Sequence, residues 1–163
     1  SGTFSPWHKG HEACVLGVRN KSVLILPDFN PWKEGRAADL WADLVAIIKF
    51  ALSHPEKDIK IYPGFMNLLH PNPTVNWLPG LALDHKHLVM GDDTFLSIHR
   101  WQDANKLLGA LDELSICPRM GREEELQKQA SYLKVNYNIV INFLPPHDYQ
   151  ELSSTSLRSG AKP

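Results

Sequence analysis

Residues 22–63 read SVLILPDFNPWKEGRAADLWADLVAIIKFALSHPEKDIKIYP, and this stretch decides the fold. It begins with an apolar run, SVLILP, and ends with another, DIKIYP, and each has the length of a short buried strand. The segment 37–54 between them has helical periodicity. We expect one face of this helix to pack on a sheet, formed by Leu40, Leu44, Ile47, Ile48, Ala51 and Leu52.

The alternation of strand and helix continues to the end of the chain. Further apolar runs lie at 86–91, 113–118 and 137–145, and helical patterns lie at 101–111 and 122–134. The strands are apolar through most of their length, which is typical of parallel sheets buried on both faces. We therefore predict an α/β fold: a doubly wound, Rossmann-like parallel sheet with helices on both faces, in a single domain spanning 1–163. The proline-rich region 63–80 is predicted to be an irregular loop with at most a short helix.

Composition limits the classes of partner. The chain has 163 residues, 43% of them hydrophobic, and a formal net charge of −1, so a broad surface for nucleic acid is not expected. No apolar run has the roughly 20 residues that span a membrane. Cys14 and Cys117 lie far apart, without the spacing of a metal site or of a disulfide framework, and we expect a cytoplasmic protein in a reducing environment.

The opening stretch SGTFSPWHKGH concentrates residues that suit a phosphate site. A glycine turn at the carboxyl end of a strand lets backbone N–H groups approach a phosphate, and we expect that strand to lie upstream of Ser1. Residues 8–18 can begin a helix, which places His8 and His11 at its N-terminus, facing one ligand. Two histidines without further ligands do not indicate a zinc site.

Two motifs carry a family resemblance. GTFSPWHKGH resembles the first signature of the HxGH nucleotidyltransferases, and SSTSLR at 153–158 resembles their second. Between them, MGDDTFLSIHRW and the strand ending in Pro118 and Arg119 resemble the corresponding segments of bacterial nicotinate-nucleotide adenylyltransferases. NPWKEG resembles a further loop of that family, with Trp32 in place of a histidine before Lys33. The resemblance covers nearly the whole chain.

The resemblance implies an enzyme of NAD biosynthesis that transfers the adenylyl group of ATP to nicotinate mononucleotide. Its implied catalytic residues are His8, His11 and Arg158. The implied ATP site adds Gly2, Thr3, Phe4, Gly91, Asp92, Ser153, Ser154 and Thr155. The implied acceptor pocket holds Lys33, Thr74, Trp101 and Arg119. Mg²⁺ is expected to accompany ATP, held by phosphates and water rather than by protein ligands.

Two other functions remain open from the sequence. The acceptor of the adenylyl or cytidylyl group could be another small phosphate, such as nicotinamide mononucleotide, although the region of Trp101 argues against phosphopantetheine. Alternatively, the chain could be a catalytically silent nucleotide-binding domain; His8, His11, Ser154 and Arg158 are all present, which counts against that reading. A homo-oligomer is possible.

Overall fold

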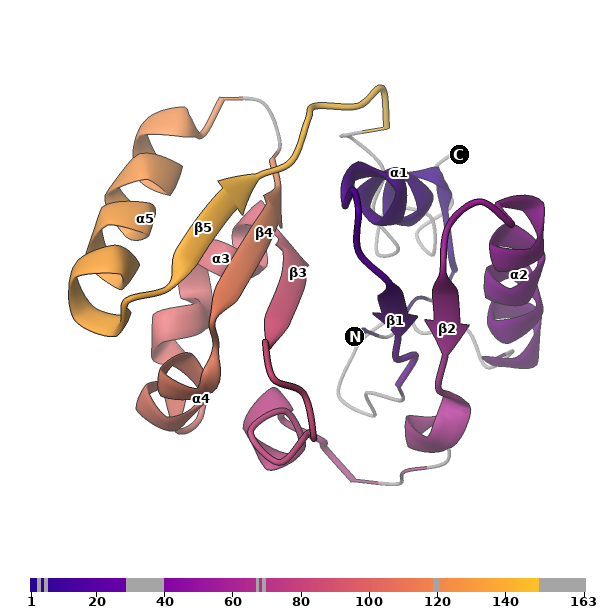
Figure 1. Cartoon of the computed structure of the whole chain (residues 1–163), viewed down its shortest axis with the longest axis horizontal. Helices are drawn as coiled ribbons and strands as arrows, with labels where there is room; N and C mark the ends of the chain where they lie inside the picture. The colour runs from indigo at the N-terminus through magenta and orange to yellow at the C-terminus, as the bar shows by residue number, and fades with distance from the viewer. Residues whose placement is uncertain are drawn as a thin grey trace. The chain divides into compact units, whose positions relative to one another are not determined.

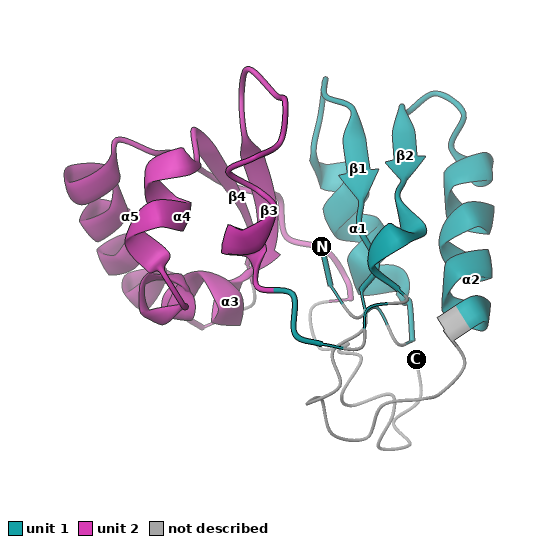
Figure 2. Cartoon of the chain, turned by 90° about the horizontal axis from the view of Figure 1, so that it is seen from below, with its two compact units in different colours: residues 1–72, 151–163 teal, residues 73–150 magenta. Residues whose placement is uncertain are grey.

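The computed structural model describes residues 1–2, 4, 6–28, 40–66, 68, 70–118 and 121–149. The chain divides into two compact units (Figure 2): unit 1 comprises Ser1–Asn72 and Glu151–Pro163, and unit 2 comprises Pro73–Gln150. The extent of a single domain over 1–163 stays a prediction.

Unit 1 contains the strand–helix–strand segment predicted within residues 22–63 (Figure 1). Its elements are α1 (Lys9–Gly17), β1 (Val23–Ile25), α2 (Leu40–Ser53), β2 (Ile59–Ile61) and the 3₁₀ turn η1 (Pro63–Phe65). Strands β1 and β2 are parallel, with Val23 opposite Ile59 and Ile25 opposite Ile61. A crossover through a helix is the usual way to join parallel neighbours, and α2 supplies it.

Helix α2 buries Leu44 and Ile47 as predicted, but its buried face is shifted from the predicted one. Leu44, Ile47 and Phe50 are buried, whereas Ile48 is 40% exposed and Leu52 is 75% exposed. The prediction for Ile48 and Leu52 was therefore wrong. Because the helix is apolar almost all the way round, its periodicity alone could not identify the side that meets the sheet.

Unit 2 is a three-stranded parallel sheet in the order β3–β4–β5. Its elements are η2 (Thr74–Asn76), β3 (His87–Gly91), α3 (Asp92–Ser97), η3 (Ile98–Arg100), α4 (Ala104–Ala110), β4 (Glu113–Cys117), α5 (Glu123–Tyr137) and β5 (Val140–Phe143). The central strand β4 is buried along its whole length. Leu114 and Ile116 from this strand pack in one core with Leu107 of α4 and Leu133 of α5, all at 0% exposure.

These elements confirm the α/β class and the Rossmann-like arrangement of parallel strands. All the predicted apolar runs contain strands, and the region 63–80 holds only the short turns η1 and η2 among its described residues. Helix α3 was not predicted. None of the helices in the described ranges is both long and apolar enough to cross a membrane.

The cysteines differ from expectation. Neither Cys14 nor Cys117 is a free thiol in the structure. The prediction that both stand outside any disulfide is therefore wrong, and the cysteines no longer support a reducing compartment.

Candidate active site

The two histidines of the opening motif form the N-terminal cap of α1. His8 is the N-cap residue, with extended backbone, and its Nδ1 accepts a hydrogen bond from the backbone N–H of Gly10 at 3.1 Å. In return, the backbone N–H of His8 donates to Nδ1 of His11 at 3.2 Å. This reciprocal pair is a capping box in which imidazoles replace the usual hydroxyl and carboxylate.

The capping bonds fix the tautomer of both rings. A neutral imidazole carries its proton on one nitrogen and accepts with the other. Because Nδ1 accepts from a backbone N–H in both His8 and His11, the proton of each neutral ring is on Nε2. Each histidine therefore offers an Nε2–H donor at the positive end of a helix, where anions are stabilised.

Aromatic neighbours hold the two imidazoles in place. The rings of His8 and His11 are stacked, with centroids 3.7 Å apart and 23° between their planes. Trp7 stacks on His11 at 5.0 Å, and Phe4 meets the edge of His11 at 4.9 Å. Trp7 is itself fixed, because its backbone N–H donates to Oδ1 of Asp43 at 3.2 Å.

Trp7 supports this site but is absent from the site residues predicted from the sequence. It directly precedes the N-cap residue His8, outside α1, and its place within the opening motif was the available signal. The indole Nε1 of Trp7 is buried without a hydrogen-bond partner among the described residues. Its contact with His11 makes it part of the site's support.

The glycine turn before α1 lies at the carboxyl end of β1. The backbone N–H of Gly2 donates to the carbonyl of Leu26 at 3.2 Å, and Asp28 N–H donates to the carbonyl of Gly2 at 2.9 Å. Gly2 and Pro27 form a parallel bridge. A Cβ at Gly2 would lie 3.1 Å from Cε1 of Phe4, so glycine leaves room for that ring. Ligands bind at this edge of parallel sheets. A strand upstream of Ser1 stays a prediction.

In unit 2, the junction of β3 and α3 holds Gly91 and Asp92. Gly91 is the N-cap of α3, and a Cβ built on it would meet no atom within 4 Å. Asp92 is only 1% exposed, and its Oδ1 accepts from the backbone N–H of Asp93 at 2.7 Å. Arg122 donates to Asp93, and this hydrogen bond, with the charge of Asp93, raises the pKa of Arg122. The place of Gly91 and Asp92 in the ATP site stays a prediction.

Two residues of the predicted acceptor pocket also lie in unit 2. Trp101 follows η3 and packs, partly buried, against the core of the unit. Thr74 opens η2, and its carbonyl accepts from Leu78 N–H at 3.0 Å. Both side chains retain some exposure. The other predicted site residues lie outside the described residues: Thr3, Lys33, Arg119, Ser153, Ser154, Thr155 and Arg158.

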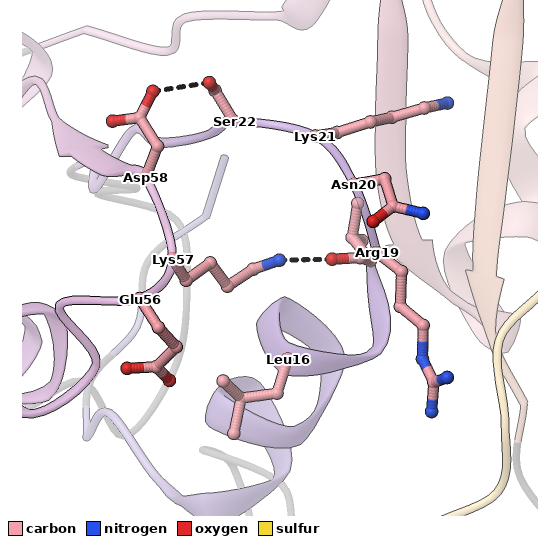
Figure 3. A pocket seen from close by; sticks show the side chains of 9 residues that line it. Leu16, Arg19, Asn20, Lys21, Ser22, Glu56, Lys57 and Asp58 are labelled. Carbon is pink, nitrogen blue, oxygen red and sulfur yellow. Dashed lines mark hydrogen bonds between the residues drawn. The ribbon is translucent and has the colours of Figure 1, made fainter.

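Two further polar groupings lie away from the predicted site. An open pocket of about 560 Å³ lies before the amino ends of β1 and β2 (Figure 3), where Lys57 donates to the carbonyl of Val18 and Ser22 donates to Asp58. None of the predicted site residues lines it. The described residues contain no group of three His, Cys, Asp or Glu side chains placed to hold a metal ion.

The other grouping surrounds Glu113, at the start of β4. Its carboxylate accepts from Asn142 and meets Nε2 of His85 at 2.8 Å. Beside it, Nε2 of His87 shares a hydrogen bond of 2.7 Å with Ser115, which is 2% exposed. Glu113 is only 8% exposed, so this network stabilises a buried carboxylate at the amino end of the sheet, away from the edge where ligands bind.

Comparison with known proteins finds relatives along most of the chain. A probable nicotinate-nucleotide adenylyltransferase of Desulfatibacillum aliphaticivorans is 29% identical over 147 residues, which cover 83% of this chain and 66% of the relative. Proteins of the same name from Leptospira interrogans and Buchnera aphidicola are 25% and 27% identical, covering 96% and 73% of this chain. This chain spans 80% and 58% of their lengths. No family model matches the chain.

The relatives agree with the class predicted from the sequence, since each of those above carries the name of an adenylyltransferase. More narrowly, the relatives are named as probable nicotinate-nucleotide adenylyltransferases, which confirms the family resemblance predicted from the two motifs.

Proposed function

We propose that this protein transfers the adenylyl group of ATP to nicotinate mononucleotide, giving deamido-NAD and pyrophosphate. A phosphate oxygen of the acceptor attacks the α-phosphorus of ATP and forms the new P–O bond. The bond from the α-phosphorus to the oxygen that bridges to the β-phosphorus breaks, and pyrophosphate leaves with the electron pair. No covalent intermediate with the protein is required, so catalysis consists of positioning and charge stabilisation.

The observation that carries this proposal is the reciprocal capping of His8 and His11 at the N-terminus of α1, from which the Nε2–H donor of each neutral ring is inferred. Negative charge builds on the oxygens of the α-phosphorus in the transition state, and preorganised donors aimed at such oxygens contribute about 3–4 kcal/mol each. Both rings are held by capping bonds and by stacking, so little reorganisation is needed when the charge develops. The N-terminus of α1 adds its own partial positive charge.

The remaining roles are assigned by resemblance. Gly2, Thr3 and Phe4 would form the turn beside the triphosphate, and Gly91 and Asp92 would complete the ATP site. Ser153, Ser154 and Thr155 would cap a helix facing the β- and γ-phosphates, with Arg158 on the leaving pyrophosphate. The acceptor would lie among Lys33, Thr74, Trp101 and Arg119, with its pyridine ring on the indole of Trp101.

Mg²⁺ belongs to this proposal as the counterion of ATP. Phosphate oxygens and water would hold the ion, as is usual for Mg²⁺ that accompanies a nucleotide. The proposed partners are ATP and nicotinate mononucleotide, with no nucleic acid or membrane. Because ATP is the donor, we place the reaction in the cytoplasm.

The test is a parallel assay with two acceptors. The protein is incubated with ATP, Mg²⁺ and either nicotinate or nicotinamide mononucleotide, and dinucleotide and pyrophosphate are measured by mass spectrometry. The proposal expects rapid product from the acid form that is lost in His11→Ala. Product only from the amide form would change the acceptor. ATP binding without product from either acceptor would favour a silent nucleotide-binding domain.

A further inference from the structure

The segment that leads into the histidine pair is attached to one side of α2. The backbone N–H of Trp7 donates to Oδ1 of Asp43 at 3.2 Å, and the indole ring lies against Phe50, with ring centroids 5.7 Å apart. Asp43 and Phe50 are both on α2, about two helical turns apart, so they share one side of the helix. Phe50 is buried, and Asp43 is partly buried. Trp7 is therefore held by the same helix at its backbone and at its side chain.

Trp7 carries this restraint to the histidines. Its ring stacks on His11 at 5.0 Å, and its backbone directly precedes His8, the N-cap residue of α1. The indole Nε1 of Trp7 is buried without a hydrogen-bond partner among the described residues, so no polar contact of the ring itself fixes its place there. Because an unpaired buried donor costs stability, the ring must be held by other contacts. Asp43 and Phe50 supply contacts of this kind.

We infer that Asp43 is a positioning residue for adenylyl transfer and that it acts on His11 through Trp7. The inference rests on the proposed function. In this role the Asp43 carboxylate fixes the backbone of Trp7, the indole fixes the plane of the His11 ring, and the Nε2–H of His11 stays aimed at the α-phosphate. Asp43 itself touches neither substrate. Such support matters because a donor that stabilises developing charge must already be in place when the charge forms.

The alternative is that Asp43 only stabilises its own helix. It lies in the first turn of α2, where a negative charge is favourable. In that role the charge of the side chain matters and the exact place of its oxygen does not. The hydrogen bond from Trp7 N–H makes the opposite demand, since it needs an acceptor oxygen at one place and no particular charge. Variants that keep one property and lose the other therefore distinguish the two roles.

Steady-state kinetics of three substitutions make this test. Asp43→Asn keeps an acceptor oxygen in place without the charge, Asp43→Glu keeps the charge but moves the carboxylate by one methylene, and Asp43→Ala removes both. We expect kcat to stay within about twofold in Asp43→Asn and to fall about tenfold or more in the other two, with a smaller change in KM for ATP. The matched control is Glu56→Ala, which removes an exposed carboxylate from unit 1 and should change neither constant. Circular dichroism verifies that all variants are folded.

Nitrogen NMR of the imidazole rings tests the inference without turnover, because it reports which ring nitrogen carries the proton. We expect the Nε2–H form of His11 in the unaltered protein and in Asp43→Asn, and both neutral forms in Asp43→Ala, where the bond from His8 N–H is weakened. His11→Ala identifies the signals. If the unaltered protein forms no dinucleotide, the proposed function fails, and this comparison still decides whether Asp43 positions His11. Unchanged kcat or an unchanged tautomer of His11 in Asp43→Ala, or an active Asp43→Glu beside an inactive Asp43→Asn, would overturn the inference.

Discussion

Trp7 stacks on His11, with ring centroids 5.0 Å apart and planes inclined by 27°. The indole lies on the imidazole, while the backbone N–H of Trp7 is held by Asp43 of α2. The orientation of His11 therefore depends on a side chain that has no polar role in the proposed chemistry. This makes Trp7 a positioning residue.

Removal of the indole should lower kcat more than it raises KM. In Trp7→Ala, the ring of His11 loses one of its stacked neighbours, so Nε2 is less well aimed at the α-phosphate, and a displacement of about 1 Å can cost up to about 100-fold in rate. Trp7→Phe keeps an aromatic face and should retain most of the activity. Steady-state kinetics with ATP as the varied substrate measure both constants. Equal losses in the two variants would contradict a positioning role.

His8 caps α1 and, in the proposed mechanism, donates a hydrogen bond from Nε2 to the α-phosphate. One substitution can separate these two functions. In His8→Asn, the side-chain oxygen can still accept from Gly10 N–H, because asparagine is a favoured N-cap residue, but the Nε2–H donor is lost. We expect the melting temperature to stay near that of the unaltered protein while kcat falls about 10²- to 10³-fold. His8→Ala should lose both activity and about 1 kcal/mol of stability. Unchanged turnover in His8→Asn would remove His8 from the proposed mechanism.

The strands were predictable from sequence, and the reason is physical. Parallel strands buried on both faces are mostly apolar, as in 113–118, where all five residues of β4 are buried and only Glu113 and Ser115 among them are polar. The cap of α1 was also predictable, because HxGH places two acceptors within one turn of the helix start.

Other features depend on contacts between segments far apart in the chain. The buried side of α2 could not be chosen by periodicity, since Ile48 and Ile47 are equally apolar, yet one is 40% exposed and the other 0%. Helix α3 follows β3 without a loop and has only six residues, so no separate helical pattern beginning at Asp92 was recognised. The support that Trp7 gives to His11 depends on Asp43 and Phe50, which lie on a different helix.

Glu113 should be important for stability rather than for turnover. Its buried carboxylate accepts a hydrogen bond from the partly buried Asn142 and pairs with the exposed His85, so Glu113→Ala would remove these hydrogen bonds and should lower the free energy of unfolding by about 1–2 kcal/mol. Urea denaturation measures the change. The matched control is Asp84→Ala, which removes an exposed carboxylate from the loop before β3 and should change stability little. A folded, fully stable Glu113→Ala protein would show that water replaces these contacts.

His147 should make stability fall on the acid side of neutrality. Burial lowers the pKa of His147, against a smaller opposing effect of Asp148, and the Nδ1 of the ring accepts from Tyr149 N–H at 3.0 Å, which requires that nitrogen to be unprotonated. The unfolded chain therefore binds a proton at this residue at a higher pH than the folded chain does. Stability that is fully present above the unfolded pKa of about 6.5 is lost as the pH falls from there toward the folded pKa.

The comparison that isolates this effect is His147→Asn. Asparagine can accept from Tyr149 N–H but does not titrate, so the variant should lose less stability than the unaltered protein between about pH 7.5 and pH 5.5. Melting temperatures across that range measure the difference, and the two proteins should agree most closely at the alkaline end. Parallel curves at all pH values would mean that His147 has the same proton affinity in the folded and unfolded chain, contrary to the burial of its ring.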